Sequence, residues 1–112
     1  MTQQDADAKG QWRLAVAAKD VANDDVVGCT VADHEIAIFR IDGEFYATSN
    51  ICTHASALLS DGFVEDCTIE CPLHNGRFDI KTGKALTSPV EVDLETYRVR
   101  VHDGQVEVLI PD

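Results

Sequence analysis

The sequence predicts an all-β protein, built as an antiparallel sandwich or a small barrel. The first observation is that Asp42-Gly43 and Asp103-Gly104 each separate two strand-like segments. This dipeptide favours a two-residue type I′ hairpin, because both central residues of that turn need a positive φ. The second observation is that no segment has the apolar period of a long helix. Short antiparallel strands joined by tight turns are therefore expected throughout the chain.

The elements follow from β-rich composition and alternation, in chain order. Strands are expected over residues 12–17, 26–32, 35–41, 44–49, 97–102 and 105–110. Segments 76–80 and 84–88 form a third expected hairpin around Lys81, Thr82 and Gly83. Residues 55–61 could form one helical turn. In the strand over 97–102, alternation places Tyr97 and Val101 on the same face.

Length and composition limit the organisation and the partners of the chain. Its 112 residues predict a single domain over 1–112, with residues 1–10 frayed. The chain has no apolar run long enough for a membrane span and no signal-peptide pattern at its start, so a cytoplasmic location is expected. Nine basic and twenty acidic residues give a formal charge of −11. Nucleic acid and anionic membrane surfaces are disfavoured as partners, whereas basic faces of partner proteins are favoured.

Four residues in two short motifs are the candidate metal ligands. Cys52 and His54 lie in C-T-H, Cys71 and His74 lie in C-P-L-H, and sixteen residues separate the motifs. Structural zinc commonly uses two cysteines and two histidines, with two to four residues between paired ligands. The single residue inside C-T-H is tight for chelating one tetrahedral ion. It suits a two-iron cluster better, in which each loop gives its cysteine to one iron and its histidine to the other.

The two motifs, followed by GRFD and TGKA, resemble the Rieske [2Fe–2S] motif of small bacterial ferredoxins, most strongly over residues 50–89. The resemblance implies a Rieske-type β-fold with two cluster-binding loops and one Rieske-type [2Fe–2S] cluster. Cys52 and Cys71 would bind one iron, and His54 and His74 the other. It also implies a one-electron carrier rather than an enzyme, with no catalytic residue of its own. Such a carrier passes electrons from a ferredoxin reductase to the terminal oxygenase of a multicomponent aromatic-ring dioxygenase, docking transiently near His54 and His74.

Departures from the motif of cytochrome bc complexes predict a low reduction potential. Ala57 and Leu73 occupy the positions of two cysteines that form a disulfide in those proteins, and Gly76 and Phe78 occupy those of a serine and a tyrosine. Without these two hydroxyls, fewer hydrogen bonds reach the cluster and ligand sulfurs. The expected potential is near the low end of the Rieske range, roughly −150 mV.

The remaining chemically notable residues have simpler expected roles. Cys67 is expected to pack in the strand CTIE, Cys29 in the core, and His34 and His102 in solvent. Further residues have a structural and a functional interpretation that stay open: Trp12, Pro72, Gly62, Gly76, and the acidic residues Asp61, Glu65, Asp66 and Glu70. Two rival functions also stay open, a small Rieske-like subunit of an assimilatory reductase and a zinc-stabilised interaction module.

Overall fold

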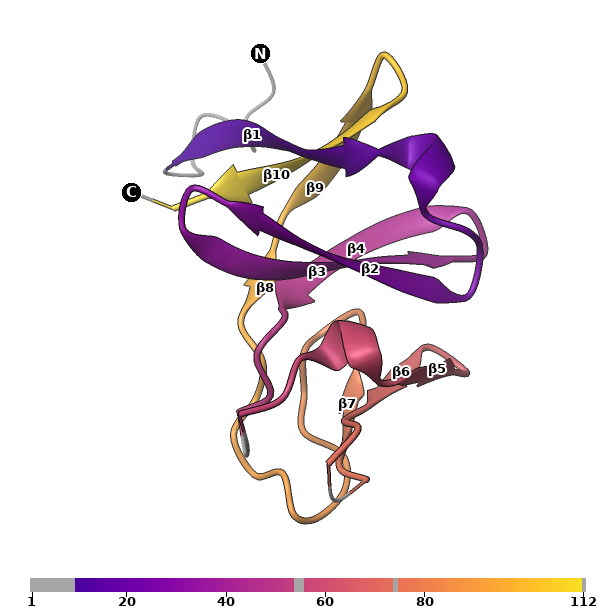
Figure 1. The fold of residues 1–112 in the computed structure, drawn as a ribbon, viewed down its shortest axis with the longest axis vertical. Coiled ribbons are helices and arrows are strands. Elements are labelled where there is room, and N and C mark those ends of the chain that lie inside the picture. The colour runs from indigo at the N-terminus through magenta and orange to yellow at the C-terminus, as the bar shows by residue number, and fades with distance from the viewer. Residues whose placement is uncertain (1–9, 54–55, 74, 112) are drawn as a thin grey trace.

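Two lobes make up the molecule in the computed structural model, which describes residues 10–53, 56–73 and 75–111 (Figure 1). Ten strands and two 3₁₀ turns are present in these residues. They are β1 (Gln11–Ala17), η1 (Ala18–Asp20), β2 (Asp25–Val31), β3 (His34–Ile41), β4 (Glu44–Ser49), η2 (Leu59–Asp61), β5 (Phe63–Glu65), β6 (Thr68–Glu70), β7 (Arg77–Asp79), β8 (Thr96–Tyr97), β9 (Val99–His102) and β10 (Gln105–Ile110). The all-β prediction is confirmed.

The two Asp-Gly hairpins are confirmed in their detailed geometry. Asp42 and Gly43 have φ values of 51° and 81°, and Asp103 and Gly104 have values of 51° and 74°. The flanking residues pair directly, Ile41 with Glu44 and His102 with Gln105. Each turn therefore joins its strands through two residues in the left-handed region, as the dipeptide predicts.

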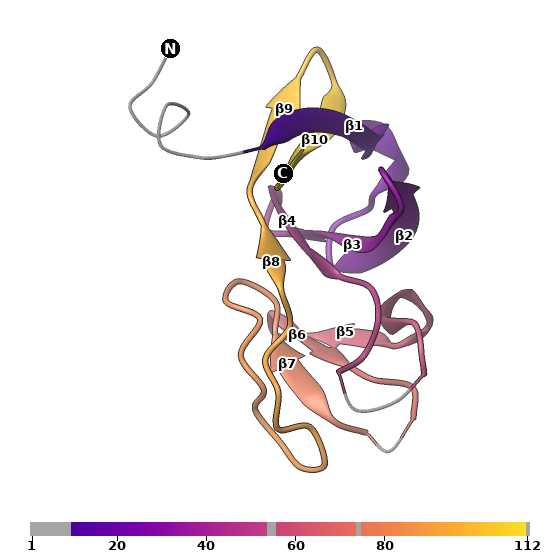
Figure 2. The same cartoon turned by 90° about the vertical axis from the view of Figure 1, so that its left-hand side faces the viewer.

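The larger lobe is a barrel-like pair of antiparallel sheets, in the orders β2-β3-β4-β8 and β1-β10-β9 (Figure 2). The single strand expected over 97–102 is divided between the sheets. Tyr97 of β8 pairs with Ala47 of β4, whereas Val99 of β9 pairs with Val108 of β10. The chain thus crosses from one sheet to the other at Arg98. Val101 lies beyond this crossing and is half exposed.

The smaller lobe contains η2 and the sheet β5-β6-β7 (Figure 1). The single helical turn expected within 55–61 is realised as η2. The third expected hairpin forms its turn, because the Asp79 N–H donates to the Lys84 carbonyl and Gly83 has a φ of 77°. Its second arm is not a regular strand: it pairs with β7 through one bridge, between Phe78 and Ala85.

Strand β3 joins the two lobes, because both of its faces are buried. Ile36 and Ile38 face the core between the two sheets of the larger lobe. Ala37 and Phe39 face a second core that extends into the smaller lobe and includes the motif cysteines. Alternate residues of a strand point to opposite faces, so an almost continuous apolar run is required here. No helix of the described residues is long and apolar enough to cross a membrane.

Candidate metal centre

Two loops at the far end of the smaller lobe carry the ligand motifs (Figure 1). The first ligand loop (51–58) follows β4 and is closed by a bridge between Ile51 and Leu58. The second ligand loop (71–76) joins β6 to β7. In the first loop, the Cys52 N–H donates to the Ala57 carbonyl at 3.0 Å. In the second, the Cys71 N–H donates to the Gly76 carbonyl at 2.7 Å. Each cysteine therefore begins a turn closed by the carbonyl five residues later, and the two loops are alike.

The two motif cysteines are buried and lie close together. Cys52 is 4 % exposed and Cys71 is 0 % exposed, within the same apolar core. The Cys52 thiol and the Leu73 backbone N–H both lie close enough to the Cys71 sulfur to affect its pKa. Burial raises the pKa of the Cys71 thiol, the neighbouring Cys52 raises it further, and the Leu73 N–H lowers it. The fold has thus brought together two thiols that are nineteen positions apart in the chain.

The two candidate histidine ligands, His54 and His74, lie outside the described residues. Among the residues that are described, no three His, Cys, Asp or Glu side chains gather closely enough to hold a metal ion. Each histidine directly follows an exposed residue, Thr53 in the first loop and Leu73 in the second. Their assignment as ligands stays a prediction.

A buried asparagine fixes the base of the first ligand loop. Asn50 is 2 % exposed, and its side chain makes two hydrogen bonds to Ser60. The Asn50 Nδ2 donates to the Ser60 Oγ at 3.0 Å, and the Ser60 N–H donates to the Asn50 Oδ1 at 2.8 Å. The Asn50 backbone also receives the Leu59 N–H and donates to the Glu35 carbonyl. Asn50, at the start of the loop, is therefore hydrogen-bonded to Leu59 and Ser60, just after its end. The sequence pattern did not reveal this role of Asn50.

A third loop (87–93) lies against both ligand loops and was also missed by the sequence analysis. The Thr53 hydroxyl donates to the Val92 carbonyl at 2.6 Å. A side chain at Gly76 would meet Val90, because an added Cβ would lie 2.5 Å from the Val90 Cγ1. Gly76 thus serves close packing of the third loop. Gly62 likewise permits a close approach, but to the Glu70 carbonyl of β6.

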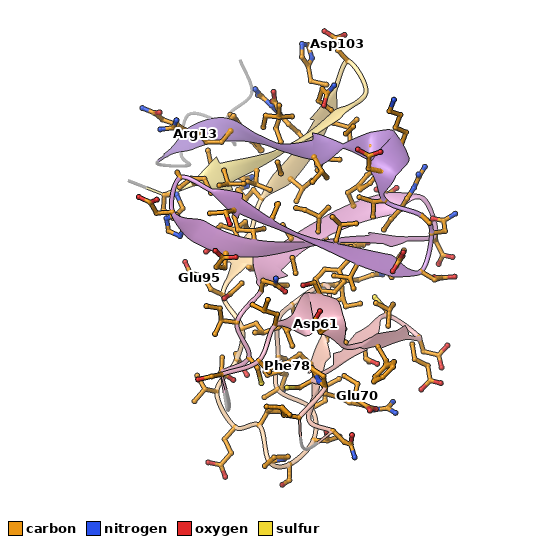
Figure 3. All side chains as sticks on the ribbon, in the orientation of Figure 1. Arg13, Asp61, Glu70, Phe78, Glu95 and Asp103 are labelled. Atoms are coloured by element: carbon orange, nitrogen blue, oxygen red, sulfur yellow. The ribbon has the colours of Figure 1, made fainter. Side chains whose placement is uncertain are left out.

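The acidic residues between the motifs are only partly free for a partner. Glu65 and Glu70 both pair with Arg77, at 3.2 and 2.9 Å (Figure 3 labels Glu70 and Asp61). Asp61 and Asp66 remain exposed. The two ion pairs of Arg77 lie at the surface, so each stabilises the fold by less than about 1 kcal/mol.

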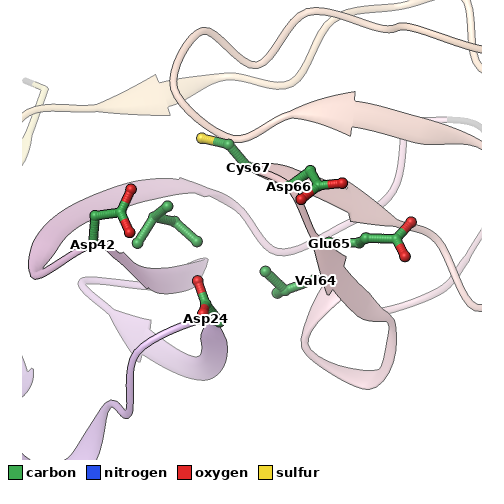
Figure 4. A pocket seen from close by; sticks show the side chains of 7 residues that line it. Asp24, Asp42, Val64, Glu65, Asp66 and Cys67 are labelled. Atoms are coloured by element: carbon green, nitrogen blue, oxygen red, sulfur yellow. The ribbon is translucent and has the colours of Figure 1, made fainter.

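Cys67 packs against the core of the smaller lobe, as expected, but it does not lie within a strand. It lies in the two-residue turn between β5 and β6, where Asp66 and Cys67 have φ values of 48° and 62°. Its side chain faces a depression of about 400 Å³ between the lobes, together with Asp24 and Asp42 (Figure 4). Burial raises the pKa of its thiol. The extended chain of β6 separates Cys67 from Cys71 by roughly 13 Å, so the two do not share a site.

The other singled-out side chains have structural partners. Cys29 packs against the core of the larger lobe, as expected. His34 is not simply solvated, because its Nδ1 lies 3.4 Å from the Tyr97 hydroxyl. His102 is exposed beside Asp103. Trp12 is covered by the guanidinium of Arg100, 4.4 Å from the ring centre.

The residues around the two motifs fit an iron–sulfur cluster better than they fit zinc. Two thiols buried in one core, one from each of two like loops, are suited to binding one shared iron. The Leu73 N–H adds a donor to sulfur, the kind of contact that tunes a cluster.

Large apolar side chains are exposed around these loops. Six of the exposed large hydrophobic residues that are described fall between positions 51 and 92. They are Ile51, Leu58, Phe63, Leu73, Leu86 and Val92. Ile51 and Leu58 border a shallow apolar depression with Ala57. Exposed apolar surface concentrated on one lobe is typical of a protein-docking site.

Comparisons with known proteins agree with this chemistry. A profile of the Rieske [2Fe–2S] domain matches residues 11–98. The ferredoxin component of the naphthalene 1,2-dioxygenase system of Pseudomonas putida is 49% identical over 98 residues, which is 88% of this chain and 94% of that protein.

Solved structures give the same result. The Sphingomonas yanoikuyae B1 ferredoxin superposes with a TM-score of 0.86 at 34% identity, over 90% of this chain and all of that one. The match in a complex of reduced oxygenase and oxidised ferredoxin in carbazole 1,9a-dioxygenase has a TM-score of 0.81 at 36% identity, over 88% of this chain and 92% of that one.

Proposed function

The chain belongs to the Rieske [2Fe–2S] domain family and, within it, to the ferredoxin components of dioxygenase systems, and we propose that it carries single electrons from a ferredoxin reductase to the terminal oxygenase of an aromatic-ring dioxygenase. It is an electron-transfer component and does not catalyse a reaction alone. The single observation that carries the proposal is that Cys52 and Cys71 are buried in the same core, each at the head of a like loop.

In this proposal Cys52 and Cys71 bind one iron of a Rieske cluster, and His54 and His74 bind the other. The burial of both cysteines in one core and the closing hydrogen bonds of the two loops support the cysteine assignment. The histidine assignment is supported by their positions in the same two loops. When bound, the cluster would supply one-electron redox chemistry at these residues.

The residues of the chain then set how readily the site accepts negative charge. Burial of Cys52 and Cys71 keeps water from the sulfurs, and the Leu73 N–H donates to one of them. Phe78 is fully buried but has no hydroxyl to offer, and Gly76 has no side chain. Fewer donors leave added negative charge less stabilised, so we expect a potential near the low end of the Rieske range, roughly −150 mV.

Docking is proposed at the ligand-loop end, near His54 and His74. The exposed side chains of Leu73 and Val92 support this placement, because they lie on the loops beside the motifs. The partner face should combine an apolar centre with basic residues, since this chain has a formal charge of −11. The terminal oxygenase is supported as a partner by the dioxygenase ferredoxins above; the reductase is inferred from the need for an electron source.

Metal and sulfide analysis tests the proposal directly. The purified protein is expected to be coloured, with two irons and two acid-labile sulfides per chain and a Rieske electron paramagnetic resonance signature when reduced. A colourless protein with one zinc would support an interaction module and overturn the proposal. His54→Cys is expected to keep iron but lose the Rieske signature, whereas an unchanged signature would exclude His54 as a ligand.

Electron transfer separates the proposed function from the rival reductase subunit. The reduced protein is expected to reoxidise in the presence of a dioxygenase terminal component, as the absorbance of the oxidised cluster returns. Reoxidation only by an assimilatory reductase would favour the rival. The single-domain organisation over 1–112 and the cytoplasmic location remain predictions, and cell fractionation tests the latter.

A further inference from the structure

Thr53 sits between two proposed ligands, Cys52 and His54, and its side chain connects the first ligand loop to a distant part of the chain. The Thr53 Oγ1 donates to the Val92 carbonyl at 2.6 Å, across thirty-nine positions of sequence. In the described residues of the first ligand loop, the only strand pairing is its closing bridge between Ile51 and Leu58. A contact with a residue outside the loop therefore helps to fix the position of Thr53.

The acceptor of this bond belongs to a segment that is itself held in place. Val90 is 5 % exposed and packs against Gly76 of the second ligand loop. At the start of the third loop, the Thr87 Oγ accepts the Arg77 N–H at 2.9 Å. At its end, the Asp93 carboxylate accepts the Ala85 N–H at 2.9 Å. The Val92 carbonyl is thus a fixed point to which the first ligand loop can be attached.

We propose that Thr53 is a positioning residue, whose hydroxyl bonds the first ligand loop to the third loop and thereby holds Cys52 in register with Cys71 of the second ligand loop. The inference rests on the proposed function, in which these residues bind the cluster. Its physical basis is a chain of contacts: Thr53 to Val92 on one side, and Val90 to Gly76 on the other. Through the third loop, the two ligand loops are fixed relative to each other.

The same contact links the cluster loops to the docking surface. The Val92 side chain is 63 % exposed, while its carbonyl receives the Thr53 hydroxyl. A partner that contacts Val92 therefore contacts the segment that holds the first ligand loop. Through Thr53, a partner bound at Val92 would therefore be connected to the loop that carries the proposed ligand Cys52.

The test compares three single variants of the cluster-loaded protein. Thr53→Val keeps the β-branched shape and removes the hydroxyl, whereas Thr53→Ser keeps the hydroxyl. Thr68→Val is the matched control, because the Thr68 hydroxyl also donates to a backbone carbonyl, that of Glu65, at 2.6 Å in the same lobe. Two quantities are measured: the first-order rate at which an iron chelator bleaches the visible absorbance, and the reduction potential.

Thr53→Val is expected to lose the cluster about 3- to 10-fold faster than wild type, the size of effect of one hydrogen bond, and to shift the reduction potential. Thr53→Ser and Thr68→Val are expected to match wild type in both measurements. If Thr53→Val also matches wild type, or if Thr68→Val changes both quantities equally, the positioning role is overturned. A wild-type protein without labile sulfide would instead overturn the proposed function, so the two failures are distinguishable.

Discussion

Replacing Gly76 with alanine is expected to loosen the ligand-loop lobe, because the new Cβ would lie 2.5 Å from the Val90 Cγ1 and 3.3 Å from its Cγ2. Ordinary contact begins near 3.4 Å. The side chain of Val90 is buried and has little room to move. Overpacking of this kind costs about 1–3 kcal/mol.

Val90→Ala removes the two methyl groups that the clash involves. Alone it is expected to cost about 1.5–2.5 kcal/mol, from two buried methyl groups and a small residual cavity. In Gly76→Ala/Val90→Ala, the nearest remaining Val90 atom is the Cβ at 3.4 Å, an ordinary contact. The double variant is therefore expected to be about as stable as Val90→Ala, well short of the sum of the single losses.

Thermal unfolding of the loaded proteins at one scan rate measures this cycle, with far-ultraviolet circular dichroism and cluster absorbance followed together. One kcal/mol corresponds to roughly 4–8 °C in the midpoint for a domain of this size. Gly104→Ala is the control, since Gly104 has a φ of 74° but no atom within 4 Å of an added Cβ. Its loss should simply add to that of Val90→Ala. Additive losses for Gly76→Ala and Val90→Ala would refute the packing argument.

Three further predictions address the loop base, the core thiol and the docking surface. Asn50→Ala is expected to lower the free energy of unfolding by about 2–3 kcal/mol, because it removes two hydrogen bonds to Ser60 in a buried site. An unchanged midpoint in thermal unfolding would contradict this prediction. Burial, aided by Glu35, raises the pKa of the Cys29 thiol. The unfolded chain then ionises first as the pH rises, so stability is present below the ordinary thiol pKa and falls above it. Cys29→Ala is expected to show a shallower loss of stability between about pH 8 and 10 in urea titrations, and equal slopes would contradict the assignment. Val92→Glu is expected to slow electron transfer to a dioxygenase terminal component at least several-fold in stopped-flow reoxidation. Leu14 is similarly exposed on the other lobe, and Leu14→Glu is expected to leave the rate unchanged. Equal effects of the two substitutions would argue against docking at the ligand loops.

Local chemistry made most of the fold predictable. The two Asp-Gly turns and their strands follow from side chains that accept a positive φ. A comparable turn at Ala32 and Asp33, with φ values of 48° and 68°, joins β2 to β3 and was not predicted as a hairpin. Alanine has no local preference for that region, so tertiary pairing of the strands must impose the conformation there.

Long-range contacts explain what the sequence could not reveal about the site. The motif spacing singled out Cys52 and Cys71 as candidate ligands, and the structure places both in one buried core. No local pattern could connect Thr53 to Val92, because their bond spans thirty-nine positions and joins a hydroxyl to a backbone carbonyl. The division of the last strand at Arg98 is similar: it depends on which sheet each half pairs with, and alternation is the same in both cases.

The structure gives a second reason for the absence of a side chain at position 76. From the sequence, Gly76 mattered because it lacks a hydroxyl that could reach sulfur. In the structure, the space beyond its Cα is filled by Val90. A serine at this position would meet the same methyl groups as an alanine, so it requires a smaller residue at position 90. Weak hydrogen bonding to the proposed cluster and tight packing of the third loop are therefore consequences of one residue. A substitution at position 76 that raises the reduction potential therefore requires a change at position 90 as well.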